Sequence, residues 1–316
     1  MRATDRAGTA DATVPALRLA VPAKVNLALH VLGRRADGYH ELQSLVAFAE
    51  IADGDSVTVG FGAPAPEGPR FAVTGPFAGA VPSGRDNLAA AAARVCPEIS
   101  YVSLVKGLPV AAGIGGGSAD AAAVLRAAAL VRRVDPATLA EAGLALGADV
   151  PVCLDGRPSV MEGVGERVRP VALPALHGLL VNPGVPLSTA DVFRNLERRD
   201  NAPFTMPSLA DVADLAAWLA TTRNDLEAPA RAACPQIDVV LAAVADHAGC
   251  LLARMSGSGP TVFGLFADAG SRDRAVTRLR ERAPRQWWVR PARFAASGEA
   301  PPAAVVVRDP PPGFAA

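Results

Sequence analysis

The segment of this sequence best suited to bind an anion is a cluster of glycines at residues 113–117. Four of these five residues are glycine, and they precede Ser118 and a long run of helix-forming residues. Glycine lets the backbone approach a ligand closely, and the start of a helix offers unpaired N–H groups and a favourable dipole for phosphate. We therefore expect an anion site here, with Ser118 as the helix N-cap. A flexible turn with an ordinary N-cap is the alternative.

Two well-known phosphate-binding motifs do not fit this segment. A P-loop requires lysine followed by Ser or Thr directly after its last glycine, but Gly117 is followed by Ser-Ala. A dinucleotide-binding G-x-G-x-x-G motif fails when started at Gly113, because position 118 is serine, and when started at Gly115, because position 120 is aspartate. The regular βαβ alternation of the corresponding folds is also missing. The sequence thus disfavours a dinucleotide-binding oxidoreductase.

The lysines are the second group of candidates, because the chain has only two of them, Lys24 and Lys106, against 29 arginines. A general drift from lysine to arginine explains the 29. An ammonium is a compact point charge, whereas a guanidinium is a planar fork. A position that has kept lysine is therefore a candidate for chemistry that needs a point charge.

The composition excludes several classes of protein. The 316 residues include 31 basic and 31 acidic side chains, so the net charge is zero, and no strong basic run suggests a nucleic-acid or anionic-membrane surface. Half of the residues are hydrophobic and a fifth are charged, as in a folded globular protein. No apolar stretch approaches the roughly 20 residues of a membrane-spanning helix. The four cysteines are widely spaced without a metal-binding pattern, which favours buried thiols in a reducing cytosol.

Strands and helices that could position these residues follow from hydrophobic periodicity and turn signals. Strands are expected at 17–33, 42–51, 56–61, 71–75, 101–108, 150–154, 177–185 and 286–294, and a strand-turn-strand unit at 250–267. Helices are expected at 87–95, 118–133, 136–147, 188–196, 209–221, 224–234, 236–249 and 272–282. Asp149 should then lie at a fixed exit from a helix, because Pro151 forces the residue before it toward an extended conformation.

The domain organisation follows from shifts in composition. Residues 1–16 are expected to be a disordered leader, because they contain acidic residues and lack the apolar core of a secretory signal. A boundary near residue 173 divides an N-terminal domain (17–173) from a C-terminal domain (174–298). Residues 299–316 are expected to be a Pro-rich tail, so the folded part should lie between about Leu17 and Arg293.

Three separated segments resemble, in order and spacing, the motifs of the GHMP small-molecule kinases. They are PAKVNLALHVLGRRADGYHELQS, LPVAAGIGGGSADAAA and ARMSGSGPTVFGLF. Within that superfamily, GRRADGYHELQS, LGADVPVCLDG, VNPGVPLSTADVFR and NDLE resemble the branch that acts on 4-diphosphocytidyl-2-C-methyl-D-erythritol. The likeness covers about Leu17 to Phe294. It implies a two-domain α+β fold, with nucleotide and substrate in the cleft between the halves.

The activity that this resemblance implies is transfer of the ATP γ-phosphate to the 2-hydroxyl of that cytidyl substrate, in the non-mevalonate route to isoprenoid precursors. Mg²⁺ is expected with ATP, but the sequence does not single out its ligands; Ser118 is one possibility. The partner is a small-molecule substrate, with no nucleic acid and no membrane. We expect a cytoplasmic protein that is a monomer or a weak homodimer.

The catalytic pair implied by the resemblance is Lys24 and Asp149. A carboxylate close to a hydroxyl can accept its proton, and an adjacent ammonium would keep that carboxylate ionised and oriented. Asn26, two residues after Lys24 on the same strand face, would support the substrate or the lysine. An aspartate in an ordinary helix-exit turn is the alternative for Asp149.

The resemblance also implies two binding sets. The ATP set is Pro109, Val110, Ala111, Ala112, Gly113, Ile114, Gly115, Gly116, Gly117, Ser118, Ala119, Asn87 and Lys106. Many relatives have a second serine where this chain has Ala119, so a hydroxyl contact there would be lost while backbone contacts remain. The substrate set is Asn26, Tyr39, His40, Phe193, Ser256 and Gly257.

Within the substrate set, Tyr39 and Phe193 would stack on the two faces of the cytosine, and His40 lies next to Tyr39. A turn aromatic and a buried helix residue are the alternatives for Tyr39 and Phe193. The turn at residues 256–259 is expected to pack against the glycine loop, although a plain hairpin turn is the alternative. His30, His177 and His247 match nothing in the family and are expected to be structural or surface residues.

Two other functions remain open at this level. One is a GHMP kinase of the mevalonate or homoserine type, although those relatives lack the GRRADGYH signature. The other is a sensor that binds nucleotide and ligand without turnover, although a sensor has no need of a proton acceptor such as Asp149.

Overall fold

The computed structural model describes residues 16–62, 66–132, 134–299, 302–307, 311 and 314. The predicted leader therefore lies outside the described residues, apart from Ala16. In the part of the chain that the structure covers, none of the helices combines the length and the apolar character needed to cross a bilayer.

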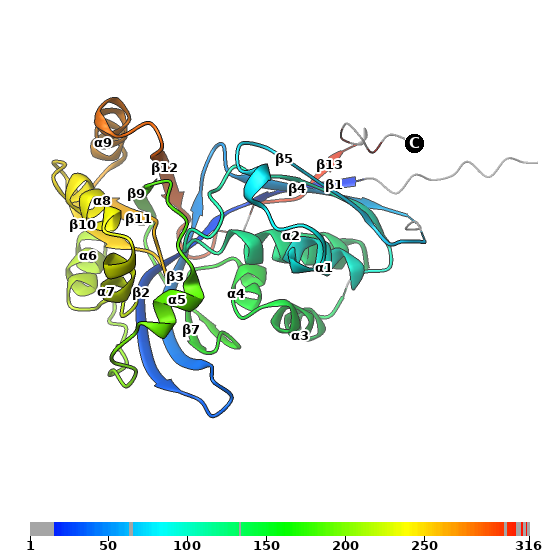
Figure 1. Cartoon of the computed structure of the whole chain (residues 1–316), viewed down its shortest axis with the longest axis horizontal. Coiled ribbons are helices and arrows are strands. Elements are labelled where there is room, and N and C mark those ends of the chain that lie inside the picture. Colours follow the sequence, from blue (N-terminus) through cyan, green and yellow to red (C-terminus); the bar gives the residue numbers. More distant parts are fainter. Residues whose placement is uncertain are drawn as a thin grey trace, which may run out of the picture.

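One half of the molecule is a five-stranded sheet covered by four helices (Figure 1). Its strand order is β13-β1-β4-β6-β5, and every pairing is antiparallel except β5 with β6. The strands are β1 (Ala16–Val21), β4 (Asp55–Phe61), β5 (Arg70–Thr74), β6 (Ile99–Val105) and β13 (Val305–Val307). The helices are α1 (Leu88–Arg94), α2 (Gly116–Arg132), α3 (Pro136–Leu146) and α4 (Val150–Asp155), with short 3-10 helices η1 (Ala78–Ala80) and η2 (Gly84–Asp86) before α1.

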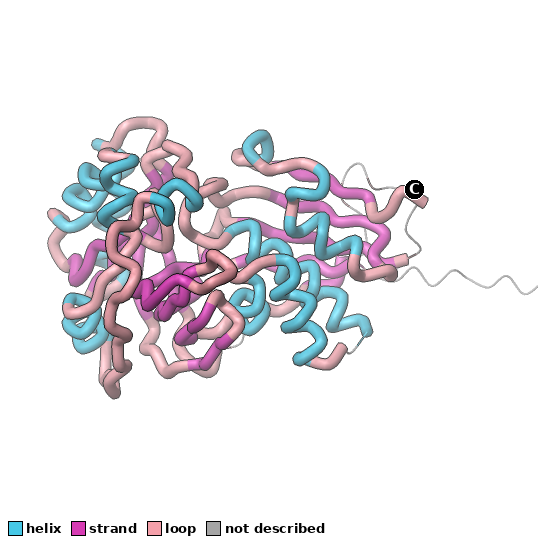
Figure 2. Tube along the Cα trace, turned by 60° about the horizontal axis from the view of Figure 1, so that its bottom comes forward, coloured by secondary structure: helices cyan, strands magenta, loops and turns pink. Residues whose placement is uncertain are grey.

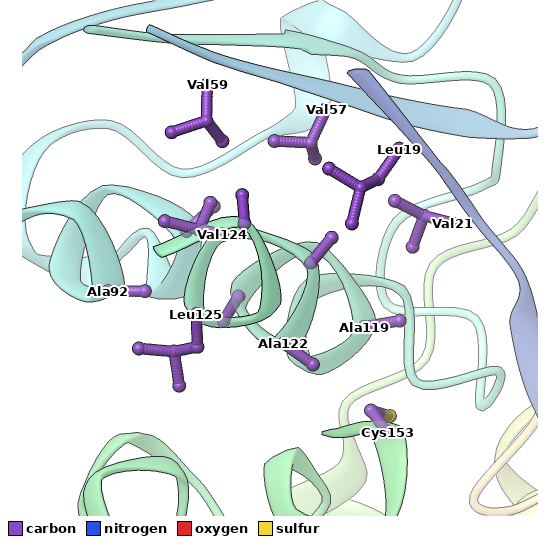
Figure 3. Close-up of a cluster of buried hydrophobic side chains, with 14 of the residues drawn as sticks. Leu19, Val21, Val57, Val59, Ala92, Ala119, Ala122, Val124, Leu125 and Cys153 are labelled. Carbon is purple, nitrogen blue, oxygen red and sulfur yellow. The ribbon is translucent and has the colours of Figure 1, made fainter. Parts of the chain in front are cut away.

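Helix α2 is buried because its sequence is rich in alanine, which lets neighbouring elements approach closely. Figure 3 shows it between strands β1 and β4, which contribute Leu19 and Val57, and helix α4, which contributes Cys153. Nine of its residues are buried. A helix apolar on most of its circumference is expected in a core, and this burial fixes where its N-terminus points.

The other half is built on an eight-stranded sheet. Seven of its strands follow the order β10-β11-β9-β12-β3-β7-β8, and the eighth, β2, pairs with β3. The strands are β2 (Ala23–Arg34), β3 (His40–Glu50), β7 (Ser159–Gly163), β8 (Arg167–Pro170), β9 (Leu176–Asn182), β10 (Cys250–Met255), β11 (Val262–Phe266) and β12 (Trp288–Phe294). The remaining helices, at the left of Figure 1, are α5 (Thr189–Arg194), α6 (Val212–Ala220), α7 (Glu227–Ala233), α8 (Gln236–Ala245) and α9 (Ala269–Arg282).

Strands β2 and β3 connect the two halves. β3 pairs with β12 through Arg293 and Glu50, so this sheet combines strands from both sides of residue 173. Figure 2, from another side, shows the strands between the helices of the two halves. The α+β class expected from the sequence is the observed one, whereas the division at residue 173 stays a prediction.

The strand predicted at residues 150–154 is wrong, because this segment is helix α4. Pro151 lies in its first turn, where proline is tolerated, and Gly156 ends it with a left-handed φ of 66°. Val150 and Val152 are buried in the core that contains α2. Five apolar-rich residues fit a strand and a short buried helix equally well by pattern, and tertiary packing decides for the helix.

The predicted limit of the folded part near Arg293 is also wrong. β13 pairs antiparallel with β1, with Ala16 opposite Val307. Farther along, the ring of Phe314 stacks on Tyr101, with 4.5 Å between ring centroids. Part of the segment expected to be a tail therefore belongs to the five-stranded sheet.

Candidate active site

Lys24 and Asp149 form an ion pair, although 125 residues separate them in sequence. Lys24 Nζ donates to Asp149 Oδ2 over 2.7 Å, and the lysine side chain is 6% exposed whereas the aspartate side chain is 33% exposed. Asp149 occupies the N-cap position of α4 but makes no capping hydrogen bond. Within the described residues Oδ1 has no partner. The pair therefore offers one free carboxylate oxygen that solvent or a ligand can reach.

The pair lies on the wall of a cavity of about 740 Å³. The residues that line it include three polar ones, Lys24, Asn26 and Asp149. They also include an aromatic group, Tyr39, His40 and Phe193. The glycine loop and the turn that contains Gly257 and Ser258 also line it. A cavity of this volume with few convergent polar groups is typical of a small-molecule site.

The glycine loop precedes α2 and reaches this cavity. Gly113 and Gly115 have φ of 70° and 61°, and Ala111 has φ of 52°, the only described residue other than glycine with positive φ. Lys24 N–H donates to Ile114 O over 3.0 Å, which fixes the loop against β2. A Cβ on Gly115 would lie 2.9 Å from Lys24 Cβ, so only glycine allows this approach.

Of the loop residues assigned to ATP, Ala111–Gly113 and Gly115–Ser118 line the larger cavity. Pro109, Val110 and Ile114 line a second cavity of about 80 Å³, which shares Ala111, Ala112, Gly116 and Gly117 with the first. Ala119 is buried and lines neither. The helix begins at Gly116, so Ser118 lies in its first turn and the prediction of Ser118 as N-cap is wrong.

The turn at residues 256–259 packs against the glycine loop. Ser256 Oγ accepts from Asn26 N–H over 3.1 Å and donates to Gly113 O over 2.9 Å. A Cβ on Gly113 would overlap Ser256 O. The structure does not bring the Ser256 hydroxyl to the cavity, because this side chain is fully buried in the contact. Gly257 lines the cavity, as does Ser258, whose Oγ is 2.7 Å from Thr189 Oγ1.

His40 and Phe193 are in contact in the part of the cavity lined by aromatic residues, which we call its aromatic end. Their rings stack with centroids 4.9 Å apart and 26° between planes, while Tyr39 is 63% exposed on the same cavity wall. His40 Nε2 is buried without a partner among the described residues. Burial, with the charges of Arg199 and Arg34, lowers the pKa of His40. A neutral imidazole that can still form a hydrogen bond therefore lies beside an aromatic face.

Asn26 lies between the ion pair and the turn. Its Nδ2 donates to Ser44 Oγ over 2.8 Å, whereas its Oδ1 is buried without a partner in the described part of the chain. Because Nδ2 is anchored, Oδ1 has a fixed direction. Asn26 lines the cavity, but its Oδ1 is covered and next to Gly257, so a ligand reaches it only if that turn moves.

Lys106 and Asn87 line the smaller cavity, but their polar groups are already engaged. Lys106 Nζ donates to Asp55 Oδ2 over 2.5 Å and to Asp120 Oδ2 over 2.7 Å. Asn87 is the N-cap of α1, with Oδ1 accepting from Ala90 N–H over 3.0 Å and Nδ2 donating to Pro82 O over 3.2 Å. The charge of Lys106 is thus neutralised by two carboxylates.

Sequence reasoning missed three polar residues that the structure places at the cavities or the loop, Asp55, Asp120 and Thr189, and it named Ser258 only as part of the turn. Asp55 carries no sequence signal, because its partners lie more than 50 residues away. Asp120 could have been noticed within the glycine-rich segment. His30, expected to be structural, is buried, and its Nδ1 lies 2.9 Å from Ala202 O.

No group of three or more His, Cys, Asp or Glu residues in the described ranges has the arrangement of a metal site. The four cysteines are free, and burial raises the pKa of Cys153 far above its usual range. These thiols therefore stay protonated and do not resemble nucleophiles.

Comparison with known proteins places this geometry in a family. Sequence models of the GHMP kinase N-terminal domain and of the GHMP kinase C-terminal domain match residues 79–157 and 204–285. The 4-diphosphocytidyl-2-C-methyl-D-erythritol kinase of Paracoccus denitrificans is 52% identical over 288 residues, which cover 90% of this chain and 97% of that protein. The kinase of the same name from Dinoroseobacter shibae is 50% identical over 274 residues, with 85% and 92% covered.

Solved structures agree with this grouping. A 4-(cytidine 5'-diphospho)-2C-methyl-D-erythritol kinase superposes with a TM-score of 0.66 at 33% identity, over 87% of this chain and 98% of its own. Homoserine kinase from Cytophaga hutchinsonii has the same TM-score of 0.66 at 18% identity, over 92% and 98% of the two chains, and this likeness concerns the fold alone. The chain therefore belongs to the 4-diphosphocytidyl-2-C-methyl-D-erythritol kinase family of the GHMP kinases.

Proposed function

We propose that this protein transfers the γ-phosphate of ATP to the 2-hydroxyl of 4-diphosphocytidyl-2-C-methyl-D-erythritol, giving ADP and the 2-phosphate in the non-mevalonate route to isoprenoid precursors. The observation that carries the proposal is the Lys24–Asp149 ion pair on the wall of a large cavity beside the glycine loop. The names of relatives about 50% identical support the choice of substrate.

Asp149 is the proposed proton acceptor. As the 2-hydroxyl oxygen attacks the γ-phosphorus, its proton moves to the carboxylate of Asp149, whose Oδ1 is free. Lys24 holds Oδ2 and thereby orients the carboxylate. The positive charge of Lys24 also favours the negative charge that develops on the attacking oxygen. Asn26 is proposed to accept a hydrogen bond from the substrate through its unpartnered Oδ1 when the turn at Gly257 moves aside.

The glycine loop is the proposed cradle for the ATP phosphates. The first N–H groups of α2 at Gly116–Ser118 lie on the cavity wall, and the helix dipole favours negative charge there. Pro109, Val110, Asn87 and the smaller cavity would lie on the nucleoside side of the loop. Mg²⁺ is proposed to enter with ATP and to neutralise phosphate charge. The hydroxyl of Ser118 is the side chain of the loop that could add a ligand to it.

The aromatic end of the cavity is the proposed cytosine site. The base would stack against Phe193 and Tyr39, and the free Nε2 of His40 would bond its polar edge. Because His40 covers Phe193 in this structure, a base that enters between Phe193 and Tyr39 has to displace the imidazole. Gly257 and Ser258 would contact the part of the substrate between the base and the reacting hydroxyl.

The deciding experiment measures ADP release with ATP, Mg²⁺ and a panel of three acceptors: the cytidyl substrate, mevalonate and homoserine. Turnover is expected only with the cytidyl substrate. Turnover with mevalonate or homoserine instead would identify another GHMP kinase, and binding of ATP and cytidyl substrate without ADP release would identify a sensor. Tyr39→Ala should raise the KM of the cytidyl substrate more than the KM of ATP.

We also propose that the reaction takes place in the cytoplasm, which is the compartment consistent with four free cysteines. The protein is proposed to act as a monomer or a weak homodimer, because a complete set of candidate catalytic residues comes from one chain. Sedimentation at micromolar concentration would test the second statement, and a tight dimer would contradict it.

A further inference from the structure

Three charged side chains form a buried cluster beneath the glycine loop. They come from the first residue of β4 (Asp55), the residue after β6 (Lys106) and the first turns of α2 (Asp120). Their side chains are 0%, 4% and 4% exposed, and Lys106 Nζ lies 2.5 Å from Asp55 and 2.7 Å from Asp120. An ion cluster this deep is costly to desolvate, so its presence calls for a purpose other than stability.

Asp55 also holds the main chain where the loop begins. Its Oδ1 accepts from Gly107 N–H over 2.8 Å and from Leu108 N–H over 2.9 Å, directly before Pro109. On the other side, Lys106 N–H donates to Thr74 O over 2.7 Å. A Cβ on Gly107 would overlap Asp53 O, so this approach also requires glycine. The start of the loop is therefore fixed through its backbone.

Lys106 connects the beginning of the glycine loop, held by Asp55, to its end at helix α2. Its ammonium reaches Asp120 in α2, and a Cβ on Gly116 would lie 3.0 Å from Nζ. Between the two attachment points lie Ala111, Gly113 and Gly115, all with positive φ. Positive φ at alanine costs conformational energy and persists only where the surroundings impose it. The cluster supplies part of that constraint.

The charge of Lys106 is offset by its two carboxylate partners. Two carboxylates surround one ammonium, and Asp120 Oδ1 is buried without a partner in the described part of the chain. Burial raises the pKa of Asp120 to about 7. A cluster whose charge is neutral or negative cannot attract phosphate by its net charge. The cluster is instead attached to both ends of the loop, through which it can affect nucleotide binding.

We infer that Asp55 is a positioning residue for nucleotide binding: its carboxylate fixes the backbone at Gly107 and Leu108 and orients Lys106, so that the loop keeps its phosphate-binding shape. This inference rests on the proposed binding of ATP at the loop. Neither the sequence motifs nor the assigned ATP set includes Asp55.

The test titrates ADP with Mg²⁺ and, separately, cytidine 5'-diphosphate into the full-length protein by calorimetry, because a loss of folded protein would weaken both ligands equally. In Asp55→Asn the Kd for ADP should rise about 10-fold or more, since each lost hydrogen bond to a charged group is substantial. The Kd for cytidine 5'-diphosphate should stay within about twofold. Asp155→Asn, which loses an exposed pair with Arg157, is the matched control and should change neither.

A Kd for ADP within twofold of wild type in Asp55→Asn would overturn the inference, as would an equal weakening of both ligands. If Asp55→Asn does not fold, Asp55→Glu keeps the charge against Lys106 but displaces the backbone contacts, and the same selective loss of ADP affinity is expected. A wild-type protein that binds cytidine 5'-diphosphate but not ADP would overturn the proposed function itself, and the variants are not needed to see it.

Discussion

Lys24 and Lys106 are held by ion pairs of nearly the same length but in opposite settings. Lys24 bonds one carboxylate that is a third exposed on a cavity wall, whereas Lys106 bonds two carboxylates that are sealed from solvent. The first arrangement leaves a carboxylate oxygen free for a reacting group. The second leaves no charge for a ligand and instead joins three backbone segments. Both lysines form ion pairs, so the ion pair alone does not distinguish them. The exposure of the carboxylate that the lysine bonds separates the candidate catalytic lysine from the positioning lysine.

The comparison explains why lysine was kept at both positions in a chain with 29 arginines. Both lysine side chains are approached closely by glycine backbone, since Cβ atoms on Gly115 and Gly116 would lie 3.1 Å from Lys24 Cε and 3.0 Å from Lys106 Nζ. A planar guanidinium needs more room than a compact ammonium. Each lysine is therefore required by the packing of the glycine loop around it.

The largest expected effect is that of Asp149→Asn, which removes the proposed proton acceptor. We expect kcat to fall about 1,000-fold, within the range for loss of a general base, while the Kd for ADP changes little. Steady-state ADP release measures the first and calorimetry the second. Asp155→Asn, at the other end of α4, is the control. A kcat within tenfold of wild type in Asp149→Asn would remove Asp149 from the mechanism and end the contrast between the two lysines.

Breaking the buried Asp55–Lys106–Asp120 cluster should cost stability. Lys106→Met leaves two buried carboxylates without their cation, so the free energy of unfolding in urea should fall by about 3 kcal/mol, as measured for broken buried ion pairs. Lys24→Met removes a pair whose carboxylate is solvent-accessible, and should lower it by about 1 kcal/mol or less. Equal losses in the two variants would mean that exposure does not distinguish the two sites.

Lys24→Arg sharpens the comparison because it conserves charge. We expect kcat to fall about 100-fold, since a guanidinium beside Gly115 shifts the loop or the Asp149 carboxylate, and a small misplacement of a catalytic group is costly. The thermal midpoint should stay close to that of wild type. Arg157→Lys, at an exposed pair, serves as the control. Near-normal kcat in Lys24→Arg would show that any cation suffices at this position.

The smallest effect concerns pH. Burial raises the pKa of Asp120 to about 7 in the folded protein, against an ordinary value of 3.8 for an aspartate in water. Between these pH values the folded state holds a proton that the unfolded state releases, so this group's contribution to stability is present below about pH 4 and is lost as pH rises to about 7. Asp120→Asn does not titrate. Its Tm relative to wild type should therefore increase by about 5 °C between pH 5 and pH 8, and a pH-independent difference would contradict this assignment.

The sequence predicted much of the fold because most elements have clear periodicity, as in the alanine-rich helix α2 and the alternating strands β1 and β4. Helix α4 was missed because five apolar-rich residues do not distinguish strand from helix without their tertiary neighbours. The segment at β13 was missed because its three valines find their partner almost 290 residues earlier in the chain.

The site was predicted from motifs. That prediction failed where the direction of a side chain determines whether the residue reaches the cavity. Sequence placed Ser256 at the substrate, but its hydroxyl points into the contact between turn and loop, while Ser258 reaches the cavity. Asp55 has no motif at all, since its importance comes from two N–H groups and one ammonium that lie about 50 residues away. Long-range contacts of this kind are set by the packed fold and leave no local pattern.

The pairing of β13 with β1 has a consequence for how this protein behaves in solution. Without it, β1 would be an edge strand with unpaired N–H and C=O groups along Ala16–Arg18, open to pairing with strands of other molecules. The C-terminal segment closes that edge, at the right of Figure 1, far along the chain from the strand that it covers. β13 is then itself the edge of this sheet, so the exposed edge passes from β1 to a strand of only three residues, in which Val305 and Val306 are exposed.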